Sequence, residues 1–356
     1  MKKPVTIRFA IIILGLHGLL VNACNCSTPL TEEELEALET SMTKIGEEWG
    51  GNMVYTHPDN PFHQEIPADY EVHENSAAMI DLIKSATGPE FTNTRLSTGD
   101  FSIPVYLADD DSPVHDIEFN LYGHPPDKTH MTDVPYIVGS KPAAGSDKHY
   151  AIIQEDSGCV YEFWLYDYNT AGGGNAHPID ENGIYEDGRS AVAAGWSALQ
   201  GLIWPKELKE FHIPHALSFS VPVTDANGYV SPATKNDGAL SDNEFAIPEG
   251  TLVRIKPEFD IDSISDIGPI EKAVYQAIQT YGMYCGDTNG AGLAIRTLSP
   301  QAVFAEAFPE EFVTNTNSGN YDLKNFPFDA LEVLKNGPLT PSESRSYVDH
   351  GCATWR

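Results

Sequence analysis

Residues 150–166, YAIIQEDSGCVYEFWLY, carry the strongest structural signal in the chain. Two runs of apolar, β-branched and aromatic residues, 150–154 and 159–166, are separated by the turn-forming sequence Asp156-Ser157-Gly158, which predicts a β-hairpin. Because side chains alternate between the two faces of a strand, Glu162, Trp164 and Tyr166 are expected to share one face. The hairpin therefore predicts a protein built mainly from β-strands.

The rest of the chain adds more short strands than helices. Strands are expected over residues 103–107, 117–121, 216–223, 251–256 and 293–295, and helices over 32–49, 76–83, 190–200, 269–284 and 329–334. Thr31 and Glu34 form a capping box before the first helix, and the glycines at 172–174 open a long loop that reaches residue 188. Strands and helices do not alternate regularly, so we expect a jelly-roll-like β-sandwich with peripheral helices.

The N-terminus is typical of an export signal. Basic residues precede an apolar run from Phe9 to Val21, which predicts a signal peptide over residues 1–23. Val21-Asn22-Ala23-Cys24 resembles the lipobox of bacterial lipoproteins, in which the cysteine becomes the lipidated first residue; Asn22 departs from that pattern, and ordinary secretion is the alternative. Beyond the signal we expect a helix and tether over 24–51, a main β-rich domain over 52–314 and a peripheral C-terminal extension over 315–356.

Composition excludes some classes of function. The 356 residues contain 52 acidic and 21 basic side chains, for a formal net charge of -31, which would repel a phosphate backbone and argues against a nucleic-acid partner. We expect contact with a membrane only through the lipid anchor. In an oxidising compartment the cysteines other than Cys24 favour one or two structural disulfides, with the pairing left open among Cys26, Cys159, Cys285 and Cys352.

Several short motifs lie along the middle of the chain, at 75–78, 147–150, 159–162, 201–203, 215–219, 229–234, 237–238 and 279–283, with Asp287 nearby. Taken together, they resemble an uncharacterised family of secreted bacterial proteins. The family has no settled activity, so the resemblance implies export and a shared fold but no reaction. This chain carries Lys235 where relatives tend to have a histidine, and residues 172–188 form an insertion relative to them.

The sequence lacks the common catalytic signatures, namely HExxH, GxSxG, the P-loop and GxGxxG. Polar residues at strand ends remain as candidates for catalysis. Asp147 and His149 are two residues apart and share one side of an extended segment, so the carboxylate can orient an imidazole base. His215 begins another strand, and we expect the two histidines to share one cleft. Glu162 lies among aromatic residues, where a carboxyl group can keep a proton as a general acid.

Each candidate residue also has a purely structural interpretation. His149 and His215 could simply satisfy local hydrogen bonds, and Glu162 could pair with Arg189 or Arg254 inside the protein. Trp164 and Tyr166 could bind sugar rings, although aromatic residues on a strand more often belong to the core. Lys235 could bind an acidic group of a substrate.

Metal binding is the weaker expectation. His124, His130 and His149 have irregular spacing, so we assign no metal site to them and expect no cofactor. Calcium is conceivable in the acidic stretches 109–111 and 287–289, but neither matches an EF-hand loop.

These observations favour an exported, lipid-anchored protein that acts on a polysaccharide or other glycan. Hydrolysis would use a pair of carboxylates, whereas β-elimination would use a histidine or tyrosine base with a cation beside the substrate's acid group. The alternative is a non-catalytic surface module that binds a glycan or a protein.

Overall fold

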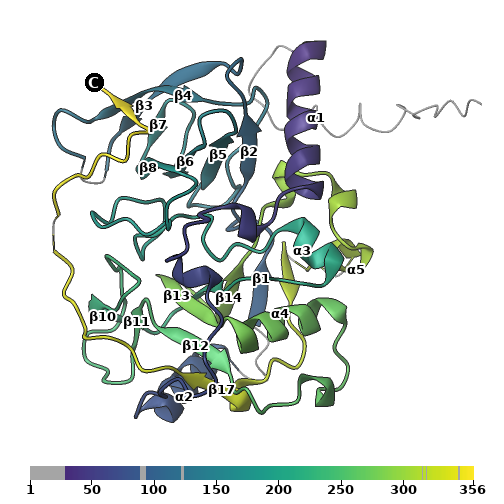
Figure 1. Cartoon of the computed structure of the whole chain (residues 1–356), viewed down its shortest axis with the longest axis vertical. Coiled ribbons are helices and arrows are strands. Elements are labelled where there is room, and N and C mark those ends of the chain that lie inside the picture. Colours follow the sequence, from purple (N-terminus) through teal and green to yellow (C-terminus); the bar gives the residue numbers. More distant parts are fainter. Residues whose placement is uncertain (1–28, 89–93, 122–123, 315, 318, 344) are drawn as a thin grey trace, which may run out of the picture.

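The computed structural model describes residues 29–88, 94–121, 124–314, 316, 317, 319–343 and 345–356 (Figure 1). The predicted signal peptide, Cys24 and Cys26 lie outside these residues. No helix in the described part is long and apolar enough to cross a membrane.

The protein is mainly β, as the sequence predicts. Its largest sheet lies in the lower half of Figure 1 and the two four-stranded sheets lie in the upper half. The large sheet has the strand order β15 (Thr316–Asn317), β16 (Asn320–Asp322), β1 (Thr94–Ser97), β14 (Leu293–Arg296), β9 (Leu217–Val221), β13 (Met283–Thr288), β12 (Leu252–Ile255) and β17 (Leu331–Val333).

Two four-stranded sheets and one strand pair complete the β structure. One sheet has the order β2 (Val105–Ala108), β5 (Tyr150–Gln154), β6 (Cys159–Trp164) and β8 (Gly173–Pro178). The other has the order β18 (Thr354–Trp355), β4 (His130–Pro135), β3 (Val114–Phe119) and β7 (Thr170–Ala171), and the pair is β10 (Thr224–Tyr229) with β11 (Ile247–Glu249).

A jelly-roll-like sandwich is not confirmed. Jelly rolls are built from antiparallel strands, whereas β1 pairs with β14, β9 with β13 and β2 with β5 in parallel. The predicted hairpin is confirmed, because β5 and β6 pair antiparallel with Tyr150 opposite Phe163 and Gln154 opposite Cys159.

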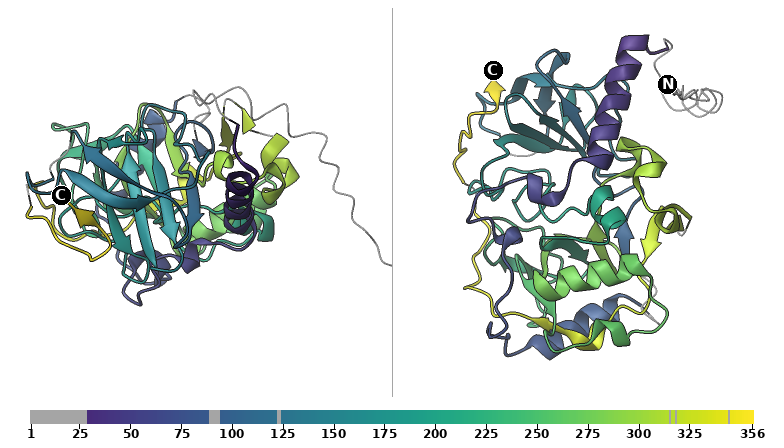
Figure 2. Two further views of the ribbon diagram at one scale, coloured as in Figure 1. Left: turned by 90° about the horizontal axis from the view of Figure 1, so that it is seen from above. Right: turned by 45° about the vertical axis from the view of Figure 1, so that its right-hand side comes forward.

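In the described part of the chain the sheets are accompanied by the α-helices α1 (Glu32–Glu47), α2 (Ser76–Ala86), α3 (Pro205–Glu210), α4 (Pro269–Thr280) and α5 (Glu310–Thr314). Short 3-10 helices lie at Gly51–Met53, Pro61–His63, Ile261–Ser263, Pro300–Ala302, Ala305–Ala307 and Phe328–Ala330. The first helix begins at the predicted capping box of Thr31 and Glu34. It is seen end-on beside the strands in the left view of Figure 2. Leu38 and Ile45 are buried on the side facing the protein, so this helix packs on the main body.

Three helix predictions are wrong in part or in full. The helix expected over 269–284 ends at Thr280, because Gly282 has a left-handed φ of +80° and the chain turns into β13. Residues 329–334 form the end of a 3-10 helix followed by β17. Residues 190–200 form no helix, because buried Glu162 accepts the backbone N–H groups of Ala191 and Ala198.

The expected loop over 172–188 contains a strand, β8, which pairs with β6 along its whole length. Its glycines concealed this strand in the sequence. A Cβ atom at Gly174 would lie 2.2 Å from the carbonyl oxygen of Glu162, so only glycine allows the two backbones to approach this closely.

The C-terminal segment, expected to be peripheral, is built into the fold. It supplies β15 and β16 to one edge of the large sheet, β17 to the other edge and β18 to a small sheet. It runs along one side of the molecule from β17 to β18 (Figures 1 and 2). A disulfide joins Cys352 to Cys159, the first residue of β6, which confirms a structural disulfide. Cys285 is buried and free. We call residues 339–352 the C-terminal strap.

Candidate active site

A cavity of about 290 Å³ lies where the β5–β6–β8 sheet meets the C-terminal end of β13. Four of the residues singled out in the sequence line it: Asp147 and His149 before β5, Trp164 at the end of β6, and Lys235 in the connection between β10 and β11. Asn236, Asp237, Asp287 and Thr288 complete its polar wall. The cavity therefore combines three carboxylates, an amine, an imidazole and an indole.

Asp287 holds a proton more tightly than an ordinary aspartate does. Burial raises the pKa of its carboxyl group to about 6, the charges of Asp237 and Asp147 raise it further, and an ion pair with Arg296 opposes the rise. A group with this pKa is largely protonated below pH 6 and can donate its proton to a bound ligand. Asp147 and Asp237 lie close enough to affect the pKa of Asp287, so the cavity brings three carboxyl groups together.

A second proton-holding acid lies behind the cavity wall. Glu249, at the end of β11, is fully buried, and burial, followed by the side chain of Asp237, raises its pKa well above the ordinary value. The backbone N–H of Asp237 donates to Glu249 Oε1 (3.3 Å), while Oε2 has no hydrogen-bond partner in the described part of the chain. Glu249 thus tethers the loop that carries Asp237.

Lys235 is the cation of the cavity. Burial lowers the pKa of its amine, and the surrounding carboxylates, Glu249 and Asp287 foremost, oppose that change. Its aliphatic stem lies against Gly188 and Gly195, where a Cβ atom would come within 3.4 and 3.3 Å of the stem. No hydrogen bond or ion pair to its amine is found among the described residues, so the amine remains available to a ligand.

His149 is buried beside the cavity and electrically neutral. Burial, followed by the positive charge of Arg296, lowers its pKa to about 3. Its Nδ1 atom has no hydrogen-bond partner in the described structure, so the expected bond from Asp147 to this atom is not found. The reason lies in Lys148, whose φ of +42° breaks the extended backbone on which that expectation depended.

His215 does not share this cavity, so the expected pairing of His149 and His215 in one cleft is wrong. Its ring is buried, with Nε2 3.1 Å from Glu207 Oε1 and Nδ1 2.8 Å from the carbonyl oxygen of Ala216. Although burial lowers the pKa of His215, the Glu207 carboxylate outweighs that effect and raises it. His215 therefore holds α3 to the start of β9 and is not among the residues that line the cavity of Asp147 and His149.

Glu162 does not line the cavity either. The side chain is fully buried, and its carboxylate accepts the backbone N–H groups of Ala191 (3.0 Å) and Ala198 (2.8 Å) and the hydroxyl of Ser197 (2.5 Å). Burial raises its pKa, and these hydrogen bonds oppose the rise. Instead of pairing with an arginine, Glu162 fixes the loop whose residues 190–193 form one wall of the cavity.

The two aromatic candidates behave differently. Trp164 is partly exposed and lines the cavity, as a sugar-binding ring would. Tyr166 is buried and stacks on Tyr150 with ring centroids 4.2 Å apart, because β6 ends at Trp164 and Leu165 takes a left-handed φ of +52°. Tyr166 is therefore a core residue and not a substrate-binding residue.

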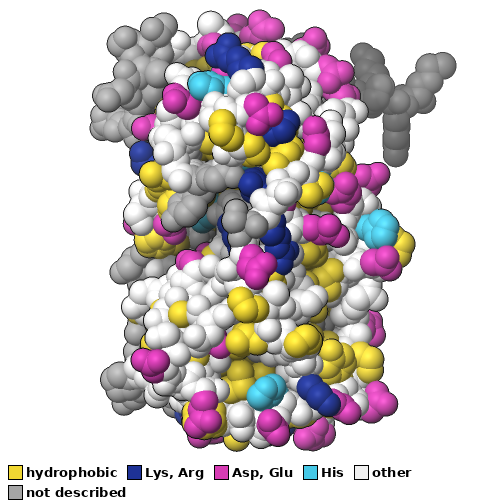
Figure 3. All heavy atoms as spheres, turned by 90° about the vertical axis from the view of Figure 1, so that its left-hand side faces the viewer, with side chains coloured by type: hydrophobic (Ala, Val, Ile, Leu, Met, Phe, Trp, Pro, Cys, Tyr) yellow, Lys and Arg dark blue, Asp and Glu magenta, His cyan; other side chains and the backbone are white. Residues whose placement is uncertain are grey.

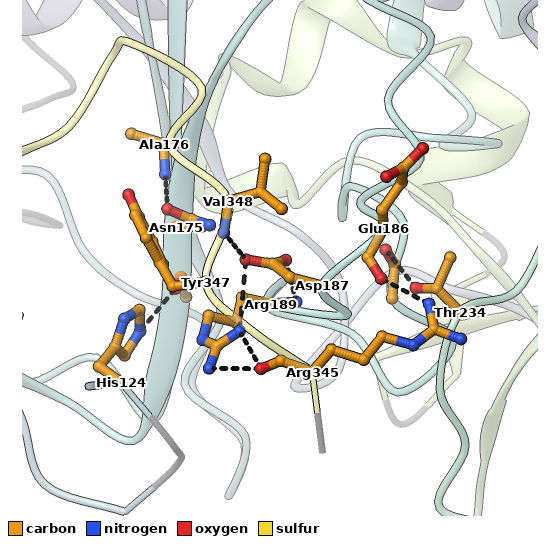
Figure 4. A network of polar contacts seen from close by, with 12 residues as sticks. His124, Asn175, Ala176, Glu186, Asp187, Arg189, Thr234, Arg345, Tyr347 and Val348 are labelled. Carbon is orange, nitrogen blue, oxygen red and sulfur yellow. Dashed lines mark hydrogen bonds and ion pairs between the residues drawn. The ribbon is translucent and has the colours of Figure 1, made fainter. Parts of the chain in front are cut away.

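The C-terminal strap is bonded to the loop that precedes one wall of the cavity (Figure 4). The side chain of Arg345 donates to the carbonyl oxygen of Glu186, and the N–H of Val348 donates to Asp187 Oδ2 (3.0 Å). The hydroxyl of Ser342 donates to the side chain of Asn236, which lines the cavity. Figure 3 shows the face along which this segment runs, with Lys and Arg side chains gathered near its middle.

The histidines and the acidic stretch 109–111 that were weighed for metal binding make other contacts in the described structure. His124 Nε2 lies 3.1 Å from the carbonyl oxygen of Gly174, and His130 Nδ1 lies 3.0 Å from the Thr129 hydroxyl, so these histidines do not converge with His149. Residues 109–111 form an exposed turn in which Asp109 accepts hydrogen bonds from Asp111 and Ser112. A more open cavity of about 360 Å³, near Tyr70 and Lys335, brings together no comparable group of carboxylates.

Sequence reasoning missed the acids that dominate the cavity. Asp287 was considered only as part of a calcium loop, and Glu249, Asp237 and Arg296 were not considered as site residues. A weak signal was present, since Asp237 and Asp287 lie within or beside the motifs quoted above. Only tertiary structure, however, packs β11 against β13 and places β14 two strands from β13 in the large sheet. Comparison with protein-family models, with curated proteins and with solved structures finds no match to this chain.

Proposed function

We propose that this protein hydrolyses a glycan in the cavity lined by Trp164, Asp147, Asp237 and Asp287. The observation that carries the proposal is an aspartate with a pKa of about 6, Asp287, in one cavity with the carboxyl groups of Asp147 and Asp237 and a partly exposed tryptophan. Glycosidases separate the roles of two carboxyl groups in this way, one as acid and one as base or nucleophile. The volume of about 290 Å³ suits one or two sugar rings.

Each group has a defined part in the proposed reaction. Trp164 stacks on a sugar ring, and Lys235, Asn236 and Thr288 offer hydrogen bonds to its hydroxyl groups. Protonated Asp287 donates its proton to the glycosidic oxygen as the bond to the anomeric carbon breaks. A second carboxyl group, that of Asp147 or Asp237, acts as the base and takes a proton from the water molecule that attacks that carbon.

Hydrolysis is favoured over β-elimination by the charge of the cavity. Elimination requires a uronic acid, whose carboxylate would have to enter a space already lined by Asp147, Asp237 and Asp287. Lys235 is the only lysine or arginine among the cavity-lining residues of the described structure, and Arg296 is engaged by Asp287. A neutral glycan therefore fits better than a polyanionic one.

The proposal includes the predicted location of the protein. Export and lipidation at Cys24 would place the cavity outside the cell, where polymeric glycans are found. The resemblance to secreted bacterial proteins supports the same location. Both the resemblance and the location remain predictions.

A glycan panel tests the proposed reaction. The purified mature protein is incubated with neutral and acidic polysaccharides, and new reducing ends and unsaturated products are measured separately. We expect reducing ends without unsaturated products, and Asp287→Asn should lower the rate by roughly 100- to 10,000-fold. The exposed Asp242→Asn serves as the matched control. Cleavage of no glycan, or full activity of Asp287→Asn, would contradict the proposal.

A further inference from the structure

A second group of polar side chains lies outside the cavity, at the far end of β8. His177 is the next-to-last residue of β8, Glu181 follows in the next turn, and His350 comes from the C-terminal strap. One nitrogen or oxygen atom from each of the three lies within 4.8 Å of the others. Residues far apart in the sequence thus converge on one point.

Both histidines have a ring nitrogen without a protein partner. His177 is fully buried; the backbone of Arg189 lies within reach of one ring nitrogen, and the other has no hydrogen-bond partner in the described structure. The buried Nε2 atom of His350 also lacks a partner, while its Nδ1 atom faces Glu181. Buried polar groups are nearly always hydrogen-bonded because leaving one unpaired is costly. A neutral imidazole has one lone pair, so an unpaired nitrogen of His177 close to Glu181 and to His350 Nδ1 indicates a ligand that accepts that lone pair.

The geometry suits a small cation. His350 Nδ1 and Glu181 Oε2 are 3.3 Å apart, and two ligands held at about 2.0–2.1 Å around a tetrahedral zinc ion lie about 3.3 Å from each other. The ring of Tyr185 lies parallel to that of His177 at an angle of 5°, which fixes the orientation of the imidazole. Glu181 is about half exposed, so the ion has a path from solvent.

We propose that His177, Glu181 and His350 bind a divalent transition-metal ion of the zinc type. Two imidazoles and one carboxylate form a donor set that such ions prefer over calcium or magnesium, which take mainly oxygen ligands. The three protein ligands leave one tetrahedral position for water. The ion joins the strap to the end of β8. Its ligand His350 lies two residues before Cys352, which forms the disulfide with Cys159.

Zinc titration of the tag-free mature protein tests this site. Metal is first removed with EDTA, and zinc is then titrated by calorimetry into the wild type, His350→Ala, Glu181→Gln and the exposed control His57→Ala. We expect one zinc ion per chain in the wild type and in the control, and affinity at least about 10-fold weaker in the two ligand variants. Zinc should also raise the Tm of the wild type but not that of His350→Ala.

Glu181→Gln should fold normally, because Glu181 lies in a turn and is partly exposed. Loss of zinc binding in this variant would therefore reflect a lost ligand and not a folding defect. Substitution of Co²⁺ gives an independent readout, since a tetrahedral site with nitrogen ligands should produce visible absorption that both variants lose. The proposal is overturned if the wild type binds no stoichiometric zinc at about 10 μM free metal. It is equally overturned if Glu181→Gln and His350→Ala bind zinc as tightly as the wild type does.

Discussion

Removal of the Cys159–Cys352 disulfide should destabilise the folded protein by several kcal/mol. The two cysteines are 193 positions apart in the sequence, so the bond closes a very long loop in the unfolded chain. The chain-entropy relation gives a stabilisation of about 5 kcal/mol for a loop of this length, and we expect a measured loss of roughly 3–5 kcal/mol.

The native state should survive this change. The strap keeps its contacts through Arg345 and Val348, and β18 keeps its pairing with β4. The loss should therefore arise mainly from the greater freedom of the unfolded chain. The near-ultraviolet circular dichroism of Cys159→Ser/Cys352→Ser should remain like that of the wild type.

Urea unfolding followed by tryptophan fluorescence measures the effect. With a denaturant slope near 3 kcal/mol per molar urea, the midpoint should fall by about 1–2 M. A reducing agent should bring the wild type to the same midpoint and leave the double variant unchanged, which provides the matched control. A shift below about 0.3 M, or an equal effect of reductant on both proteins, would refute the reasoning.

Three further predictions concern residues singled out in the sequence. Glu162→Gln replaces an acceptor oxygen by an NH₂ group, so it should cost about 1–3 kcal/mol and increase hydrogen exchange in residues 190–198; unchanged exchange would contradict the assigned role. His215→Ala breaks a buried contact with Glu207 and should cost about 3 kcal/mol, while turnover per folded molecule stays constant. Because the pKa of His215 is raised in the folded state, its contribution to the free energy of unfolding should be complete below the unfolded pKa of about 6.5 and should decline as pH rises through the folded pKa. A difference in stability between wild type and His215→Ala that stays constant across pH would contradict this. Cys24→Ser should move the protein from membranes to the soluble fraction if the lipid anchor is present, whereas membrane retention would exclude that anchor.

Local sequence patterns predicted the elements that depend on local interactions. The capping box of Thr31 gave the start of α1, and the turn before Cys159 gave the β5–β6 hairpin, because both signals lie within a few residues of each other. Helix prediction failed over 190–200, where a carboxylate about thirty residues earlier in the chain takes the backbone N–H groups. That competition is a tertiary effect and leaves no periodic pattern in the sequence.

The candidate site was predicted only in part, because some of its residues are close in sequence and others meet only through the tertiary fold. Asp147, His149, Trp164 and Lys235 do share one cavity. Trp164 lies on the hairpin that the sequence identified, and Asp147 and His149 lie just before its first strand. His215 was misplaced because a histidine at a strand start can serve a cap or a cleft, and only the position of Glu207 on α3 decides between them. Asp287 acquires its role from burial and from Arg296, two strands away in the sheet.

The pH dependence of turnover in the wild type and in Asp287→Asn tests the central claim most directly. If protonated Asp287 is the general acid, kcat on the cleaved glycan should fall about tenfold per pH unit above a midpoint near pH 6, where this carboxyl group loses its proton. Asp287→Asn should lower kcat and abolish that fall. A wild-type kcat that stays constant from about pH 5 to 8, or a variant that keeps both the rate and the midpoint, would contradict the assignment.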